Sequence, residues 1–247
     1  VNHVSGLNTC THTQGIPVAR AEADAAPWPA VAPAIDISNF NGRIDLVVNE
    51  RLCCPRVEAT AWSARGAVDV SNQATLDQVG VTATLDGGVY RIVTTRQEGL
   101  PEQVGVHLSI AVPSAGAITV YNRGGPVMIV GAAGAVQVEN GRGPVESEWW
   151  DDDAWIQLRT PAAIDQPVAL VTDSGDVAII LGPAARGALD LQSPAGIPNA
   201  RARVGTFDQF RATGHSITAR YNDGANPSLL RTDNGDATAL MIEHPES

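Results

Sequence analysis

One short sequence phrase recurs along the chain and restricts its possible folds more than any other feature. Each copy has two runs of alternating apolar and polar residues, separated by a turn built on Asn or Asp with Gly. Four copies are clear, at residues 118–130, 136–147, 168–180 and 230–242. Alternation with a period of two is typical of β-strands, and Asn, Asp and Gly adopt positive φ at tight corners. The phrase therefore predicts strand, corner, strand.

The spacing of the copies predicts how these strands are arranged. Asn122 and Asn140 occupy the same corner position 18 residues apart. Later corners recur at uneven intervals, as if some repeats carried insertions, near Asp173, Ser193, Asn222 and Asp233. A unit of this length cannot bury its own apolar face, so neighbouring units must stack and share one core. We expect an all-β fold in which residues 113–247 form a parallel β-solenoid or β-roll of short rungs.

Residues 34–112 also have strand patterns, but with longer and less regular spacing. Strand-like runs occupy residues 35–48, 56–61, 82–85, 89–94 and 104–112. The first run has a corner at Asn41 and Gly42, and the turn at residues 86–88, Asp-Gly-Gly, is the clearest hairpin signal. The irregular spacing favours a conventional antiparallel sheet in this first β-rich part, which can still share one domain with residues 113–247.

Composition narrows the class of protein and of partner. The chain has 24 glycines, 16 prolines, 4% aromatic and 17% charged residues, which suits many short strands joined by tight turns. A net charge of -11 without a cluster of cations argues against a nucleic-acid partner, because phosphate contacts need clustered positive charge. No apolar run is long enough for a transmembrane helix, so we expect no membrane span in this chain.

Residues 1–33 are polar and then rich in Ala and Pro, with no periodicity, which predicts an extended N-terminal arm. Such an arm is ordered only if the body, a disulfide or another chain holds it, since termini otherwise fray. The chain begins at Val1 rather than Met, so we expect an upstream piece. If that piece is a secretion signal, the mature protein works outside the cytoplasm.

Three cysteines offer one way to hold the arm. Cys10 lies in the arm, whereas Cys53 and Cys54 are adjacent in the body. A bridge from Cys10 to one of the pair would fix the arm and leave one thiol over. Buried thiols, or a metal site that adds His3 and His12, remain alternatives, although the paired spacing of zinc sites is absent.

The most conspicuous local feature is the acidic and aromatic segment at residues 146–155, Glu-Ser-Glu-Trp-Trp-Asp-Asp-Asp-Ala-Trp. Its simplest interpretation is a polar excursion at a corner, with a Trp covering the edge of the core. Trp is also favoured at protein interfaces, so docking of a protein partner comes next, ahead of sugar or calcium binding. The candidate partner-binding residues are Trp28, Trp149, Trp150, Asp151, Asp152, Asp153 and Trp155.

No catalytic motif is present: there is no nucleophile elbow, zinc-protease helix, phosphate loop or dinucleotide fingerprint. Parallel β-helices include enzymes that act on polysaccharides, and residues 151–153 with Arg159 could serve such a reaction, but nothing in the sequence brings them together. His107 and His215 are interpreted as satisfied strand or loop residues. The Asp-x-Gly-Asp corners at 173–176 and 233–236 are interpreted as turn-forming rather than calcium-binding. We expect no enzyme activity, no cofactor and no metal.

Several of these motifs together resemble a known group of domains. They are Asn-Phe-Asn-Gly-Arg-Ile at 39–44, Val-Pro at 112–113 followed by Ile-Thr-Val, Thr-Asp-Ser-Gly-Asp-Val at 172–177 and Thr-Asp-Asn-Gly-Asp at 232–236. Over about residues 35–242 the chain resembles the bacterial putative-adhesin domains of unknown function. The resemblance implies a secreted or membrane-tethered protein with a right-handed parallel β-solenoid, and it carries no catalytic residues. Residues 148–155 and 194–215 interrupt the pattern, and the arm has no counterpart in it.

These observations predict a non-enzymatic, extracytoplasmic scaffold or adhesion protein that presents rigid faces to a protein partner. A close variant is a membrane-extrinsic subunit that stabilises a larger bacterial membrane complex, with residues 1–33 as its docking strap. The alternative is a glycan-binding or glycan-cleaving β-helix protein.

Overall fold

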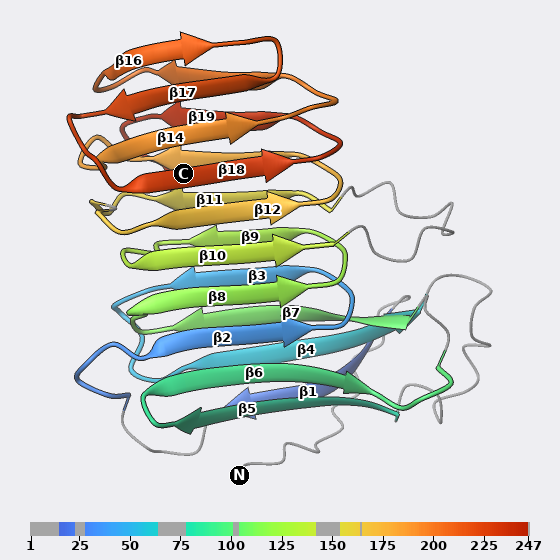
Figure 1. Ribbon diagram of the computed structural model, residues 1–247. Coiled ribbons are helices and arrows are strands. Elements are labelled where there is room, and N and C mark those ends of the chain that lie inside the picture. Colours follow the sequence, from blue (N-terminus) through green and yellow to red (C-terminus); the bar gives the residue numbers. More distant parts are fainter. Residues whose placement is uncertain are drawn as a thin grey trace.

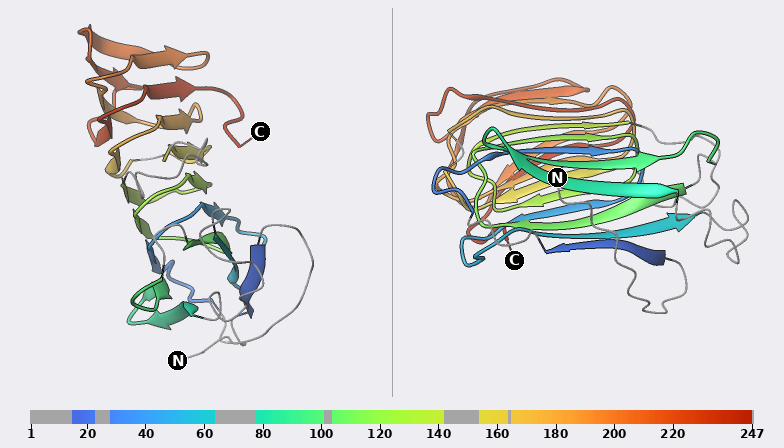
Figure 2. Two further views of the ribbon diagram at one scale, coloured as in Figure 1. Left: turned by 90° about the vertical axis from the view of Figure 1, so that its right-hand side faces the viewer. Right: turned by 90° about the horizontal axis from the view of Figure 1, so that it is seen from below.

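The computed structural model describes residues 15–22, 28–63, 78–100, 104–141, 154–163 and 165–246. These residues form β-strands and contain no helix, as the sequence predicts. The strands make two large sheets that face each other as two layers (Figures 1 and 2). In spatial order, the ten strands of sheet A are β16 (Phe207–Ala212), β17 (Ser216–Tyr221), β14 (Gly187–Gln192), β18 (Pro227–Thr232), β12 (Val168–Thr172), β10 (Ala135–Asn140), β8 (Ala117–Asn122), β2 (Ala34–Asn39), β6 (Val89–Arg96) and β5 (Val79–Asp86).

The nine strands of sheet B lie opposite. In spatial order they are β1 (Gly15–Glu22), β4 (Arg56–Ser63), β7 (Val104–Val112), β3 (Ile44–Val48), β9 (Val127–Val130), β11 (Ile156–Thr160), β13 (Val177–Leu181), β19 (Ala237–Met241) and β15 (Pro198–Ala202). From β8 to β13 the chain alternates between the sheets, and each of these strands pairs in parallel with its neighbours. Three of the four predicted repeats therefore place one strand in each sheet across a corner: β8 with β9, β12 with β13, and β18 with β19. In the copy at 136–147 the second run lies outside the described residues, and the strand of sheet B that follows β10 is β11.

The alternating patterns direct one set of side chains inward. In β7, Val104, Val106, Leu108, Ile110 and Val112 are all buried, and the same alternation in the other central strands adds Ile, Val, Leu and Ala to one hydrophobic core. That core runs from Ile35 to Met241, so both β-rich parts contribute to it. Each fully buried Val, Leu or Ile contributes roughly 1.5 to 3 kcal/mol, which makes this continuous core the main source of stability.

The expectation of a conventional antiparallel sheet in residues 34–112 is wrong for the inner strands and right only for the outer pairs. β2 pairs in parallel with β6 and β8, and β3 pairs in parallel with β7 and β9. Antiparallel pairing is confined to the outer strands, where β5 joins β6, and β4 joins β7 and β1. The β5–β6 connection is the predicted hairpin: Gly87 and Gly88 both have positive φ, as a two-residue turn requires.

The first and the last strand pairs that join sheet A to sheet B across a corner lie inside the stack rather than at its ends. β2 and β3 lie between β6–β7 and β8–β9, and β18 and β19 lie between β12–β13 and β14–β15. The antiparallel strand β16 ends sheet A at the top of Figure 1, where the parallel strand β15 ends sheet B, and the antiparallel strands β5 and β1 end the two sheets at the bottom. Repeats that are neighbours in the sequence are therefore not always neighbours in space.

A row of buried polar side chains runs along one edge of the stack, where strands of sheet A end and the chain turns into sheet B. We call this row the polar ladder; its members in spatial order are Thr94, Asn39, Asn122, Asn140, Thr172, Thr232 and Ser193. Asn122 Nδ2 donates to the carbonyls of Gly42, Gly124 and Gly125 at 3.0 to 3.1 Å. Asn140 Nδ2 donates to Gly125 O and Ala154 O. The ladder thus supplies side-chain donors to buried corner carbonyls, of which Gly124 O also accepts from Gly42 N.

The ladder corrects three of the predicted corner positions. Thr172 and Thr232 are the buried ladder residues, whereas the neighbouring Asp173 and Asp233 are exposed. Asn222 follows the antiparallel strand β17 and donates instead to Pro183 O and Ala185 O, so it is not an equivalent corner. Ser193 is confirmed, because its hydroxyl donates to Gly235 O at 2.6 Å.

Tyr90 on β6 gives the fold a testable alkaline sensitivity. Burial raises the pKa of Tyr90 from 10.0 to about 12, and within the described ranges its hydroxyl has no hydrogen-bond partner. The folded state therefore keeps a proton that the unfolded state loses, so the free energy of unfolding falls as the pH rises from about 10 to about 12, by up to about 2 kcal/mol from this group. Urea titrations at pH 7 and pH 11 should show a smaller loss for Tyr90→Phe than for the wild type, with no cost at pH 7. Tyr121→Phe, at an exposed position, is the control; an equal alkaline loss in both variants would contradict the assignment.

Candidate functional site: the outer face of sheet B

Trp28, the first predicted partner-binding residue, is held by the body of the same chain. Its Nε1 donates to Ser114 Oγ at 2.9 Å, and its ring meets the buried ring of Tyr90 edge-on at 5.3 Å between centroids. Earlier in the arm, β1 pairs antiparallel with β4 of sheet B. Both described pieces of residues 1–33 before Ala34 thus contact their own chain.

The acidic and aromatic cluster is described only at its end. Residues 142–153, with Trp149, Trp150, Asp151, Asp152 and Asp153, lie outside the described residues. Trp155 is half-buried just before β11, and its carbonyl accepts from Val127 N at 2.9 Å. Arg159 lies on the outer face of β11, where its Nε donates to Gln157 Oε1. The structure thus places Trp155 and Arg159 on sheet B, far along the stack from Trp28 beside β6.

The cysteines and the predicted metal ligands are only partly described. The Sγ atoms of Cys53 and Cys54 lie 3.6 Å apart, which is too far for a bond between them. Cys10, His3 and His12 are outside the described residues, so the bridge from the arm stays a prediction. Among the residues that are described, no three His, Cys, Asp or Glu side chains gather in a way that could hold a metal ion. The same residues include no helix of the length and apolarity that crossing a membrane requires.

The Asp corners bind the neighbouring strand pair. Asp176 Oδ1 accepts from the backbone N–H of Asp236 at 2.8 Å, and Asp236 Oδ1 accepts from Ile197 N at 2.7 Å. The expected turn-forming role is therefore refined: these carboxylates tie corners together across the stack. Gly175, between Thr172 and Asp176, has φ of +81°, as its corner position predicts.

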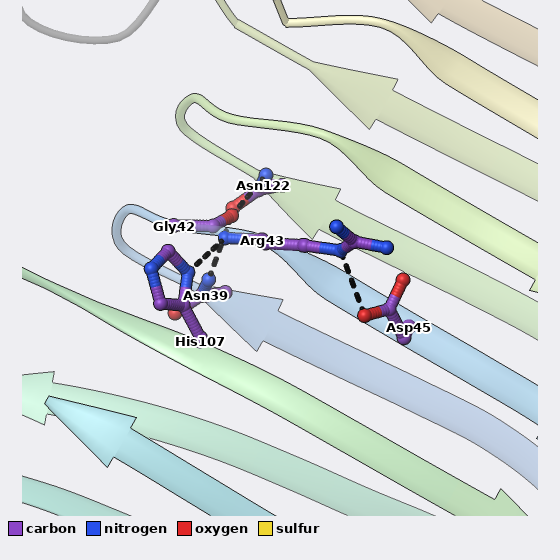
Figure 3. Close-up of polar contacts among 6 residues, drawn as sticks. All are labelled: Asn39, Gly42, Arg43, Asp45, His107 and Asn122. Atoms are coloured by element: carbon purple, nitrogen blue, oxygen red, sulfur yellow. Dashed lines mark hydrogen bonds and ion pairs between the residues drawn. The ribbon is translucent and has the colours of Figure 1, made fainter. Parts of the chain in front are cut away.

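One corner carries charge and aromatic rings onto the outer face of sheet B (Figure 3). Arg43, the last residue before β3, forms an ion pair with Asp45 at 2.7 Å. His107 on β7 accepts a hydrogen bond from Arg43 N at its Nδ1 (3.0 Å), and its ring stacks on Trp62 at 5.4 Å. His107 is thus a satisfied strand residue, as expected.

Four residues further along the strands from this corner, an apolar row crosses sheet B. At the same register position on successive strands, the outward residues are Ala111, Val47, Val130, Arg159, Ile180 and Leu240, which we call the sheet-B row. All six are half-buried and point away from the core, because their strand neighbours are the buried inward residues. Five of the six are apolar. Contiguous apolar side chains on an outer face mark binding surfaces more often than scattered ones do.

The outer face of sheet A differs. Its corresponding row on β2, β8, β10, β12, β18 and β14 is mostly polar or charged and consists of Ser38, Tyr121, Glu139, Val171, Arg231 and Gln192. The contrast makes the outer face of sheet B the candidate interaction surface. The sequence carries a signal for this surface. β13 reads Val-Ala-Ile-Ile-Leu without alternation, and an uninterrupted apolar run indicates that both faces of a strand avoid water.

Comparison with known proteins supports the fold. No protein-family model matches the sequence, and no curated protein matches it. A solved structure named "putative cell adhesion protein", from Clostridium sporogenes, has a TM-score of 0.52 and 9% sequence identity, covering 85% of this chain and 94% of that chain. A "putative adhesin" from Bacteroides fragilis has 12% identity over 85% of this chain and 92% of that chain, but its TM-score of 0.32 is too low to show a shared fold. At such identities the first likeness shows a shared fold.

Proposed function

We propose that this chain is a non-enzymatic, extracytoplasmic adhesion or scaffold protein that binds a protein partner through the outer face of sheet B. The sheet-B row carries the proposal. Its four large aliphatic side chains, Val47, Val130, Ile180 and Leu240, occupy outward positions on central strands of a rigid sheet. A protein partner would remove this apolar surface from water, at roughly 25 cal/mol per Å² of apolar area.

The geometry around the row favours a protein over a lipid or nucleic acid. Arg43, Asp45 and His107 form a polar cluster at one end of the face, and Arg159 interrupts the row near its middle. An apolar centre with a few oriented polar groups resembles the composition of protein interfaces. The overall charge of -11 opposes binding to phosphate backbones.

The fold is consistent with this role, because the structure from Clostridium sporogenes that shares it is named a "putative cell adhesion protein". We also propose that the strand pairs joined by the polar ladder are rungs of a right-handed β-solenoid. Regular stacking of identical corners would give the rigid faces that an adhesion or scaffold role requires. A membrane-extrinsic subunit that stabilises a larger complex is a variant of the same proposal, in which the partner sits at a membrane.

Substitution of one residue of the row tests the proposal. Ile180→Asp on β13 introduces a charge into the proposed interface, and Val171→Asp on the preceding strand β12 makes the matched change on the outer face of sheet A. We expect a stoichiometric protein partner, captured by the purified tagged chain from a cell-surface fraction and identified by mass spectrometry, to be lost with Ile180→Asp. It should remain with Val171→Asp, and both variants should keep the circular dichroism spectrum of the wild type.

Two outcomes would count against a protein-binding face on sheet B. One is equal loss of the partner with both variants, and the other is retention with Ile180→Asp. Binding of the wild type to a glycan array, with cleavage or without it, would instead support the glycan alternative, which rests on the acidic and aromatic residues near Trp155.

A further inference from the structure

The last strand pair fills a slot between segments that precede it in the chain. β18 pairs in parallel with β12 on one side and β14 on the other. β19 likewise lies between β13 and β15. The slot is therefore complete before residue 203, and the strands that fill it arrive from β17 through a connection at residues 222–226.

That connection crosses the start of β14 at very close range. β17 and β18 lie on opposite sides of β14, so residues 222–226 must pass over its first residue, Gly187. A Cβ on Gly224 would lie 2.0 Å from Gly187 N, and a Cβ on Gly187 would lie 2.8 Å from Asn226 O. Gly224 is required for this crossing, since no side chain fits between the two backbones there. A Cβ on Gly187 would first meet the hydroxyl of Tyr221 on β17, at 2.3 Å.

The connection is also conformationally costly. Asn222 and Asp223 are consecutive non-glycine residues with φ of +48° and +56°, in the left-handed region, which Asn and Asp adopt at a lower cost than other L-residues but less readily than glycine. Asn222 is held there by its donations to Pro183 O and Ala185 O. A short connection under strain is the kind of hinge that favours exchange of the element beyond it between two copies of a chain.

We propose that β18 and β19 can pass to a second copy of this chain, so that each copy fills the slot of the other. Every pairing of these strands with β12, β13, β14 and β15 would be kept in the exchanged dimer. Only residues 222–226 would differ: they would run extended between the copies, releasing the crossing over Gly187 and the left-handed conformations. The partner is thus a second copy, and the site that it fills is incomplete without it. This inference is independent of the proposed adhesion role.

Gly224→Val tests the hinge, because a side chain at that position blocks the closed crossing. Gly214→Val, in the turn before β17, is the matched control, since a Cβ there meets no atom within 4 Å. Light scattering on chromatographed full-length protein in about 0.15 M salt, which screens the repulsion between two acidic copies, should show a dimer for Gly224→Val. Gly214→Val should have the same mass as the wild type. A monomeric, merely destabilised Gly224→Val would overturn the proposal.

An engineered disulfide distinguishes exchange from ordinary dimerisation. Val171 and Arg231 are register partners on β12 and β18 and both point outward, at a spacing that a disulfide can bridge. A chain with Gly224→Val and Val171→Cys is refolded together with a chain carrying Gly224→Val and Arg231→Cys. Exchange predicts a link between positions 171 and 231 of different chains, identified by peptide mass, and a dimer without this link would refute exchange.

If Gly224→Val does not fold, the same cysteine pair is used with the natural hinge. Refolding at increasing protein concentration should then increase the fraction of chains linked between positions 171 and 231, because exchange is bimolecular. The absence of that link at every concentration would overturn the proposal.

Discussion

Gly42→Ala is expected to lower the free energy of unfolding by about 3 to 5 kcal/mol, because two independent costs coincide at this corner. Gly42 has φ of +121°, and a Cβ at this position would lie 2.2 Å from Val106 O on β7. That carbonyl belongs to the backbone of a central strand, and Asn39 Nδ2 already donates to it, so it cannot move aside without breaking the polar ladder. Urea titration of the purified protein measures the difference.

Gly88→Ala separates the two costs. Gly88 also has positive φ, at +78°, but a Cβ there would meet no atom within 4 Å. Its substitution should therefore cost only the conformational part, about 1 kcal/mol. Equal losses for the two variants would show that the close approach at Gly42 does not matter.

Asn122→Leu is expected to have an effect of similar size, about 3 to 4 kcal/mol, for a different reason. Leu has nearly the same shape, so the packing volume is kept while the donations from Asn122 Nδ2 to Gly42, Gly124 and Gly125 are lost. Three carbonyls at a buried corner would then lose this donor. Each keeps a second one, from Gly42 N, Asn140 Nδ2 or Asn39 Nδ2, so the expected cost is that of three lost buried hydrogen bonds at about 1 kcal/mol each. The measurement is thermal and urea unfolding of the variant.

Thr119→Leu is the matched control for the ladder. Thr119 lies on the same strand, β8, but is exposed on the outer face of sheet A. We expect its substitution to change stability by less than about 0.5 kcal/mol. If Asn122→Leu were as mild as Thr119→Leu, the ladder would be a by-product of stacking rather than a cause of it.

The sequence predicted the local elements of the fold because their signals are local. Period-two alternation located strands such as β7 and β12, and paired glycines located the β5–β6 turn. The inward position of Thr172 also follows from the sequence, since Thr172 continues the alternation of Val168 and Leu170. The turn chemistry of Asp173 places the predicted corner one residue later.

Other features depend on which strands pair with one another, and no local sequence signal determines that pairing. β14 accepts β18 on one side and β17 on the other with equally unremarkable alternating sequences, so the insertion of the last pair could not be predicted from spacing. The same holds for β2 between β6 and β8. The acidic and aromatic residues 146–155 predict a different surface from the candidate one, whose signal in the sequence is the uninterrupted apolar run of β13.

The internal position of β2–β3 and β18–β19 determines how the protein would respond to mechanical tension. A pull applied directly before β2 and directly after β19 would enter the stack inside its two ends, because other strands lie beyond both pairs. The tension between these points would pass through the pairs β8–β9, β10–β11 and β12–β13, whose sheet-A strands carry the polar ladder, while the strands beyond the two points would lie outside its path. For a protein that holds a partner against a moving surface, the first structure to yield would then be the most regular part of the molecule, and the ends that seal its core would stay closed.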